Sequence, residues 1–174
     1  KVENDKITSD LQSYTVTEPQ ATVMLDANIK AAEAEVERIL KKNGVTATEW
    51  LALAGSRELA AMVDMKFNGV FGSKTAKAFA SGDRAAFWYE IRYGNVSATG
   101  TGPNDRGLQK RRYWDAEWVG LYAGTQATPT EAMSLYKVLT ENRKRILDSE
   151  ALHGITPDGR RGTSQLGGKT AFEL

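Results

Sequence analysis

Three short segments of this chain carry the same signal for the start of a helix. They are TEPQ at residues 17–20, TATE at 46–49 and TPTE at 128–131. Each begins with threonine and has a glutamate or glutamine three positions later, which is the capping-box pattern. Two of them also place proline early in the helix, where its missing N–H is tolerated. A chain with such helix starts along its length is restricted to largely helical folds.

Apolar residues in the following segments recur at spacings of three and four, as they do on one face of an α-helix. The clearest case lies within residues 29–40, where we expect a helix that begins at an Asp26 cap and ends near Gly44. Other helix starts are expected at Ser56, Ser73, Asp83 and either Asn104 or Asp105. No segment shows the period-two alternation of a half-buried strand. The predicted fold class is therefore all-α.

The composition excludes several classes of protein. The 174 residues suit one domain with a sizeable core, and no apolar run approaches the ~20 residues of a membrane span. A net charge of +1 gives no general attraction to nucleic acid. With no cysteine and His153 as the one histidine, disulfides, thiolate metal sites and histidine-based zinc sites are not expected. We therefore expect no metal, no nucleic-acid partner and no membrane insertion.

The segment AAFWYEIRYGNV at residues 85–96 mixes aromatic, acidic and basic side chains. Glu90 beside these aromatic rings has two interpretations. If desolvated, it would have a raised pKa, as a general acid requires. Alternatively, it forms an ion pair with Arg92, Arg111 or Arg112 and fastens two helices together, and this structural role is favoured because buried acids are usually paired.

A second mixed segment, GLQKRRYWDAEWVGLY at residues 107–122, contains the basic run Lys110, Arg111 and Arg112. Three residues with acidic neighbours make too short a run for a nucleic-acid patch. Such a run is either a solvated helix face or a place where an arginine orients a carboxylate or a sugar substituent.

The order of segments from LAAMVDMKFNGVFG to NDRGLQKRRYW, residues 59–114, resembles the C-terminal lobe of phage T4-type lysozymes. The stretch from Val63 to Gly69 matches the end of that lobe's buried core helix. The motifs WYEIRY and RRYW are more similar to those of pesticin-like and phage-tail lysozyme domains. Similar domains lie at the C-terminus of the valine-glycine-repeat spike proteins of type VI secretion. Upstream, residues 16–40 are similar to the linker helix and first helix of the lobe. The resemblance covers roughly residues 15–122.

The resemblance implies an enzyme that hydrolyses the β-1,4 bond between N-acetylmuramic acid and N-acetylglucosamine without a cofactor. In that family the catalytic glutamate lies in an N-terminal lobe with an aspartate and a threonine. Residues 1–14 are too short to hold that lobe and lack its glycine pattern, so Glu3 and Asp5 are poor candidates. Because the chain begins at Lys1 without methionine, we expect it to be part of a longer protein whose general acid lies upstream.

A permuted lysozyme is an alternative, because Glu150, Asp158 and Thr163 follow one another in the family's catalytic order. Too few residues follow them to build the hairpin lobe. The expected organisation is therefore an N-terminal extension at 1–14, the lysozyme-like lobe at 15–122, an additional helix at 123–152 and a flexible tail at 153–174. Glu90 and Glu150 remain weak candidates for a catalytic acid within this chain.

Five residues of the matched lobe are candidates for contact with the glycan, as the resemblance implies. Phe67 and Asn68 align with the aromatic and amide side chains on the floor of the family's cleft, although Phe67 could equally be core. Arg92 and Arg111 fall near cleft-side arginines, and Arg112 competes with Arg111 for that register. Asp64 replaces a family asparagine, which leaves that position's role open.

The expected partners are peptidoglycan strands and, for a secreted toxin, an immunity protein. The expected location is outside the producing cell or in the periplasm of a target bacterium. A non-catalytic domain that binds peptidoglycan or the immunity protein is the alternative function, and a helical structural domain without a cleft is a third.

Overall fold

The computed structural model describes residues 15–94, 105–124 and 126–152, and these residues form eight helices and no strand. The helices are α2 (Glu18–Lys42), α3 (Ala47–Ala52), α4 (Arg57–Phe67), α5 (Ser73–Ala80), α6 (Arg84–Tyr93), α7 (Asp105–Val119), α8 (Pro129–Glu141) and α9 (Arg143–Leu152). The predicted all-α fold class is confirmed. The expected extension at 1–14, most of the loop at 94–105 and the expected tail at 153–174 lie outside the described residues.

The helix starts follow the capping signals of the sequence. At α3, the Thr46 hydroxyl accepts the backbone N–H of Glu49 at 3.2 Å, and the Glu49 carboxylate accepts the N–H of Thr46 at 2.7 Å. The same reciprocal pair forms at residues 128–131 before α8. Ser56 and Asp83 cap α4 and α6 as expected. These caps satisfy N–H groups that have no partner inside the helix.

Two expected helix boundaries are wrong. Residues 18–42 form one continuous helix, and Asp26 is an exposed residue within it and does not start a second helix. The expected single helix within 123–152 is divided into α8 and α9 at Asn142. The Asn142 side-chain amide donates to the carbonyl of Val138 at 2.9 Å, which ends α8, and its own carbonyl then accepts the N–H of Ile146 at the start of α9.

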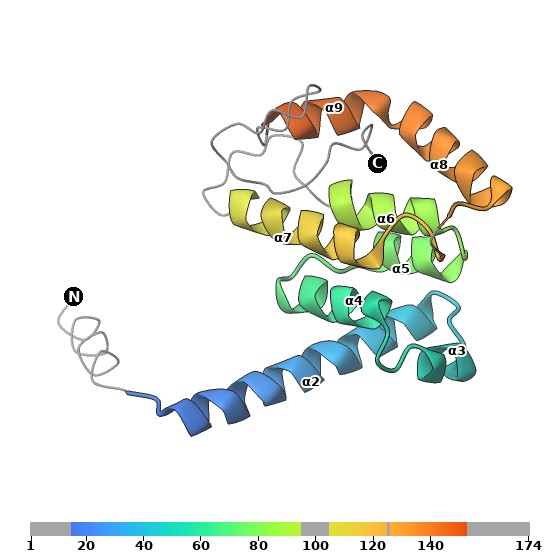
Figure 1. The fold of residues 1–174 in the computed structure, drawn as a ribbon. Helices are drawn as coiled ribbons and strands as arrows, with labels where there is room; N and C mark the ends of the chain where they lie inside the picture. Colours follow the sequence, from blue (N-terminus) through green and yellow to red (C-terminus); the bar gives the residue numbers. More distant parts are fainter. Residues whose placement is uncertain (1–14, 95–104, 125, 153–174) are drawn as a thin grey trace.

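In Figure 1, α2 lies at the bottom of the molecule with α4 above it. Helices α5, α6 and α7 follow, and α8 and α9 lie at the top. Helix α4 packs on the C-terminal half of α2, α6 packs between α5, α7 and α8, and α7 also contacts α4. The N-terminal half of α2 extends beyond the neighbouring helices, and its residues 18–31 are all exposed. In the described part of the chain, no helix combines the length and apolar character needed to cross a bilayer.

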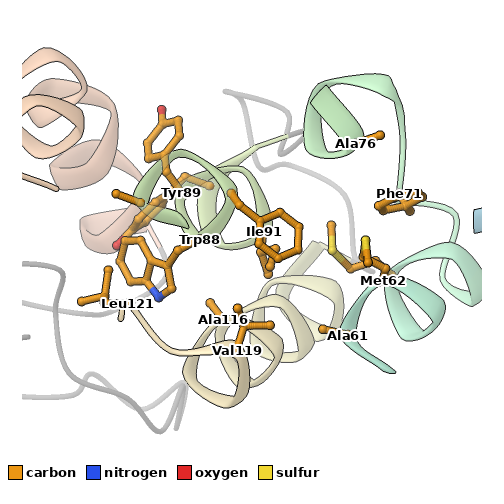
Figure 2. Packing of buried hydrophobic residues seen from close by; sticks show 14 of the residues in the cluster. Ala61, Met62, Phe71, Ala76, Trp88, Tyr89, Ile91, Ala116, Val119 and Leu121 are labelled. Atoms are coloured by element: carbon orange, nitrogen blue, oxygen red, sulfur yellow. The ribbon is translucent and has the colours of Figure 1, made fainter. Parts of the chain in front are cut away.

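One hydrophobic cluster joins these helices (Figure 2). Met62 from α4, Trp88 from α6 and Val119 from α7 belong to it and are buried. Val138 of α8 and Ile146 of α9 belong to the same cluster. The helices that follow residue 122 therefore share a core with the segment that resembles the lysozyme lobe.

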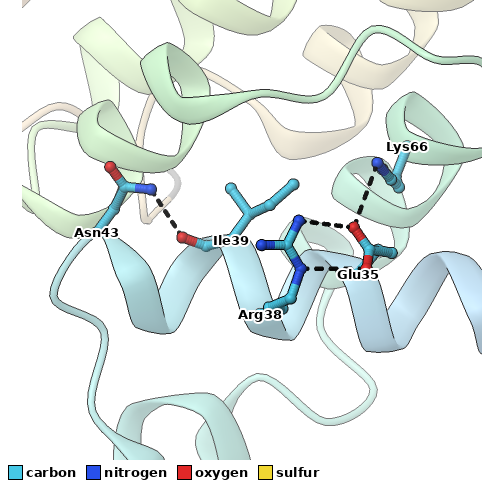
Figure 3. A network of polar contacts seen from close by, with 5 residues as sticks. All are labelled: Glu35, Arg38, Ile39, Asn43 and Lys66. Carbon is cyan, nitrogen blue, oxygen red and sulfur yellow. Dashed lines mark hydrogen bonds and ion pairs between the residues drawn. The ribbon is translucent and has the colours of Figure 1, made fainter.

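Polar contacts reinforce the packing of α2 on α4 (Figure 3). The Glu35 carboxylate accepts two hydrogen bonds from the Arg38 guanidinium, at 2.9 and 3.1 Å, and lies 3.7 Å from the Lys66 ammonium of α4. At the end of α2, the Asn43 amide donates to the carbonyl of Ile39 at 2.7 Å. Exposed ion pairs of this kind contribute little stability, so apolar burial dominates this helix contact.

The C-terminus of α6 is buried, and side chains from two other helices satisfy its carbonyl groups. Arg112 of α7 donates to the carbonyls of Glu90 and Ile91, at 2.6 and 2.7 Å. Gln109 donates to the carbonyl of Arg92 at 3.0 Å, and Arg145 of α9 donates to that of Tyr93 at 2.9 Å. Since a buried carbonyl without a partner is costly, these bonds fix α7 and α9 against α6.

Replacing Arg112 with methionine removes both donors from buried carbonyls, and we expect it to lower the free energy of unfolding by about 3 kcal/mol. The neighbouring Arg111→Met is the matched control, because Arg111 is exposed and its ion pair with Asp64 is at the surface. The control should change stability by less than about 1 kcal/mol. Urea unfolding followed by circular dichroism measures both, and equal losses in the two variants would contradict this role.

Candidate functional site

A cavity lies between α2, α4 and α7. Its volume is about 630 Å³. Its lining is mainly apolar but includes several charged side chains. The lining residues are Leu25, Ile29, Glu33, Gly55, Ser56, Arg57, Leu59, Ala60, Val63, Asp64, Phe67, Arg111 and Trp118. A concave apolar surface with a few polar groups is the usual form of a ligand site, which makes this cavity the candidate site.

The cavity follows from the register of three helices. On α2, the buried positions Ala32, Val36 and Leu40 pack against the core, and the same stripe continues toward the N-terminus with Ile29 and Leu25. Beyond the core, no helix in the described part of the chain covers this stripe, and its side chains line the cavity. The α2 surface is therefore part of the site because its apolar pattern is longer than the helix surface that α4 covers.

Phe67 is one of two exposed aromatic residues in the lining, the other being Trp118. Phe67 lies at the C-terminus of α4 and is 50% exposed although it is strongly apolar. Asn68 follows as the α4 C-cap, and its amide donates to the backbone carbonyl and the carboxylate of Asp64, at 2.7 and 3.2 Å. Of these two predicted residues, the structure places Phe67 in the cavity lining, whereas Asn68 supports the neighbouring Asp64.

Arg111 and Asp64 meet across the α4–α7 contact at this cavity. The Arg111 guanidinium lies 3.3 Å from the Asp64 carboxylate, and both side chains are partly exposed. Such a pair can donate and accept hydrogen bonds to a polar ligand. Among the three predicted arginines, Arg111 is the one that lines the cavity.

Asp115 lies on α7 between Arg111 and Trp118, at helical spacings of four and three, and is 8% exposed. Burial and the neighbouring Asp64 carboxyl, to which it is hydrogen-bonded, raise the pKa of Asp115 to about 7, although Arg112 and Arg111 act in the opposite direction. Its carboxyl is therefore partly protonated at neutral pH. A group in this state can donate or accept a proton near pH 7.

Arg92 and Arg112 are fully buried, so the structure separates them from the cavity surface. The Arg92 guanidinium lies 3.8 Å from the ring centre of Tyr113 and 5.2 Å from that of Trp88, within the interior. Arg112 is directed at the carbonyls of α6, and burial lowers its pKa to about 10. Burial gives both arginines internal partners and disfavours direct contact with a glycan.

Glu90 and Glu150 also lie outside the cavity lining. One Glu90 carboxylate oxygen is buried without a hydrogen-bond partner, and the Arg112 bond goes to the backbone carbonyl of Glu90 rather than to this carboxylate. The hydrogen bond between the two residues thus uses the Glu90 backbone, although the Glu90 side chain also acts electrostatically on Arg112. Glu150 is buried and accepts the hydroxyl of Tyr93 at 2.5 Å. The other members of the permuted order, Asp158 and Thr163, lie outside the described residues.

Three residues in or next to the cavity lining were not predicted as site residues from the sequence. They are Asp115, Trp114 and Trp118, the last two each being 54% exposed. The signal that could have found them is the segment WDAEW, in which two tryptophans four residues apart share a helix face and the acids Asp115 and Glu117 lie between them in the sequence. Among the described residues, no group of three or more histidine, aspartate or glutamate side chains is placed to hold a metal ion.

The pKa of Asp115 predicts a pH-dependent stability. Its folded value of about 7 exceeds its ordinary value of 3.8, so between these values the folded chain holds a proton that the unfolded chain has released. The free energy of unfolding should therefore fall as pH rises from about 4 to 7, by on the order of 2 kcal/mol after solvent screening is allowed for. Urea unfolding at several pH values should show this decline in the native chain and a flatter profile in Asp115→Asn. The exposed Asp148→Asn on α9 is the charge control, and identical profiles for the native chain and Asp115→Asn would refute the prediction.

Comparison of the chain with protein-family models, curated proteins and solved structures gives no match. The resemblance to T4-type lysozymes therefore remains a prediction from the order and spacing of its motifs. What the cavity does is inferred from its residues and their geometry.

Proposed function

We propose that this chain supplies the glycan-binding wall of a lysozyme-type muramidase, an enzyme that hydrolyses peptidoglycan at the bond between N-acetylmuramic acid and N-acetylglucosamine. The observation that carries the proposal is the cavity between α2, α4 and α7, with Phe67 half exposed in its lining. Aromatic faces exposed in a cavity suit the apolar faces of sugar rings. Phe67 is also the residue that the lysozyme resemblance assigns to the cleft floor.

Polar groups of the same wall suit the remaining chemistry of a sugar. Arg111 presents N–H donors and Asp64 presents carboxylate acceptors, and the two lie together at 3.3 Å. A glycan hydroxyl or acetamido group could exchange hydrogen bonds with this pair. Such contacts orient the strand, while the hydrolysis itself needs a general acid and a second carboxylate or an activated water.

The same cavity bears on which carboxyl could be the general acid. Glu90 and Glu150 are directed into helix packing and do not line the cavity. We therefore propose that another segment, outside the described residues, supplies the acid of the enzyme. Asp115 is the described carboxyl whose pKa, about 7, would suit proton donation, and it is included in the test below.

The proposed biological role is that of an antibacterial effector or a phage lysin. Delivery to the periplasm, by a type VI spike or a phage tail, would bring the wall to its substrate. This role belongs to the lysozyme resemblance, and the cavity supports it only through its fit to a glycan.

A second candidate function is the binding of a protein partner such as an immunity protein. The specific observation in its favour is the exposed N-terminal half of α2, where Val23, Met24 and Leu25 are all largely solvent-exposed. Apolar side chains gathered on a projecting helix are typical of an interface. This candidate predicts tight binding of a protein and no retention of the chain by peptidoglycan.

Co-sedimentation with purified peptidoglycan sacculi tests the proposed function. The native chain should be retained, and Phe67→Ala should weaken retention by about tenfold, because about 1.4 kcal/mol of ring contact is lost. Tyr136→Ala is the matched control, since Tyr136 is an exposed aromatic residue on α8, away from the cavity. Retention that does not depend on Phe67, or no retention of a folded chain, would contradict the proposal.

Loss of turbidity of the same sacculi locates the general acid. We expect the chain alone not to clear them. Clearing that is abolished in Glu90→Gln, Glu150→Gln or Asp115→Asn would place the acid in this chain and overturn its assignment to another segment.

A further inference from the structure

A second cavity lies beside the first one, at the WDAEW segment of α7 that contains Asp115. Its volume is about 410 Å³, and its lining consists of Trp114, Asp115, Glu117 and Trp118. Trp118 lines both cavities, so the two form neighbouring parts of one surface. Trp114 and Trp118 are each 54% exposed, although their large apolar rings would ordinarily be covered.

Asp115 is the buried polar group of this cavity. It is more than nine-tenths buried, and no lysine or arginine among the described residues forms an ion pair with it. The two nearby arginines have other partners, since Arg111 pairs with Asp64 and Arg112 donates to the carbonyls of α6. Asp115 thus has the Asp64 carboxyl as its hydrogen-bonded neighbour, while Arg112 and Arg111 act on it only through their charge.

We propose that this second cavity binds a primary ammonium group, with Asp115 as its counter-ion and the rings of Trp114 and Trp118 beside it. An ammonium donates hydrogen bonds to carboxylates, and it is attracted to the faces of tryptophan rings, so the lining offers both kinds of contact. Glu117 adds a further negative charge to the lining. In the context of the proposed function, on which this choice of ligand rests, the ammonium is that of a diamino acid in a peptidoglycan stem peptide.

Proton linkage follows from the charges around Asp115. The groups acting on it are Asp64 of α4, and Arg111 and Arg112 of α7; Glu90 of α6 and Arg145 of α9 act in turn on Arg112. Burial and Asp64 hold the pKa of Asp115 near 7, and a bound cation lowers it again. At pH 6, binding should therefore release roughly one proton from Asp115 to the buffer.

Isothermal titration calorimetry with two pairs of probes tests this site. The first pair is Nα-acetyl-lysine amide and its Nε-acetylated form, which lacks the cation. The second pair is soluble muropeptides that carry a free diamino-acid amine and the same muropeptides after acetylation of that amine. We expect each free amine to bind at least about tenfold more tightly than its acetylated form. At pH 6 its binding enthalpy should change with the ionisation enthalpy of the buffer.

Asp115→Asn is the principal variant, because asparagine keeps the shape of aspartate and can still hydrogen-bond to Asp64. It should remove the preference for the free amine and the proton release. Asp148→Asn, which deletes one exposed carboxylate on α9, should change neither. A preference that survives in Asp115→Asn, or equal binding of free and acetylated probes, would overturn the ammonium site.

The outcomes separate this site from the proposed function. Equal binding of free and acetylated muropeptides refutes the ammonium site and leaves glycan binding intact. Binding of the free lysine probe that depends on Asp115, with no binding of any muropeptide, keeps the ammonium site but refutes the peptidoglycan ligand. In either case circular dichroism of the variant shows that the helices are retained.

Discussion

The buried C-terminus of α6 is the constraint on which the rest of this structure depends. The last carbonyl groups of a helix have no hydrogen-bond partner inside that helix. In the protein interior, water does not supply the missing hydrogen bonds. Here Arg112, Gln109 and Arg145 supply the donors. Since these side chains come from α7 and α9, satisfying one helix end also fixes the positions of two other helices.

This constraint also determines which face of α7 lines the cavities. Arg112 is directed inward to α6, so the helical repeat turns Arg111, Asp115 and Trp118 toward α4 and the cavities. Adjacent arginines thereby have opposite roles. One is a buried cap with a lowered pKa, and the other is a partly exposed side chain that pairs with Asp64.

The site combines two features that are unfavourable for folding alone. The apolar stripe of α2 continues past its packed part to Leu25 and Ile29, and a carboxyl pair joins α4 to α7 where an apolar contact would be cheaper. The proposed ligands would make each feature favourable, because a glycan would cover the apolar surface and an ammonium group would offset the charge of the paired carboxyls. The proposed glycan wall and the proposed ammonium site account for one feature each.

The sequence predicts those parts of the fold whose interactions join residues close together in the chain. The starts at Thr46, Ser56, Asp83 and Thr128 were predictable, because each cap bonds to a backbone group only three residues away. The helix start expected at Asp26 was wrong. An aspartate can cap a helix, but here the backbone is already helical on both sides of Asp26. Phe67 and Arg111 were also predicted as site residues, through the lysozyme resemblance, and the structure brings both to one cavity.

The sequence by itself determined the helical class, most helix starts and the apolar stripes that build the core, since these depend on neighbours within one or two turns. Only the tertiary structure decided which arginine is buried and which is exposed, because adjacent residues of one helix face different surroundings. It also decided that Asp64 and Asp115, which are far apart in the chain, share a site. The pKa of Asp115 depends on burial and on the neighbouring Asp64, and both of these arise only when α4 packs against α7.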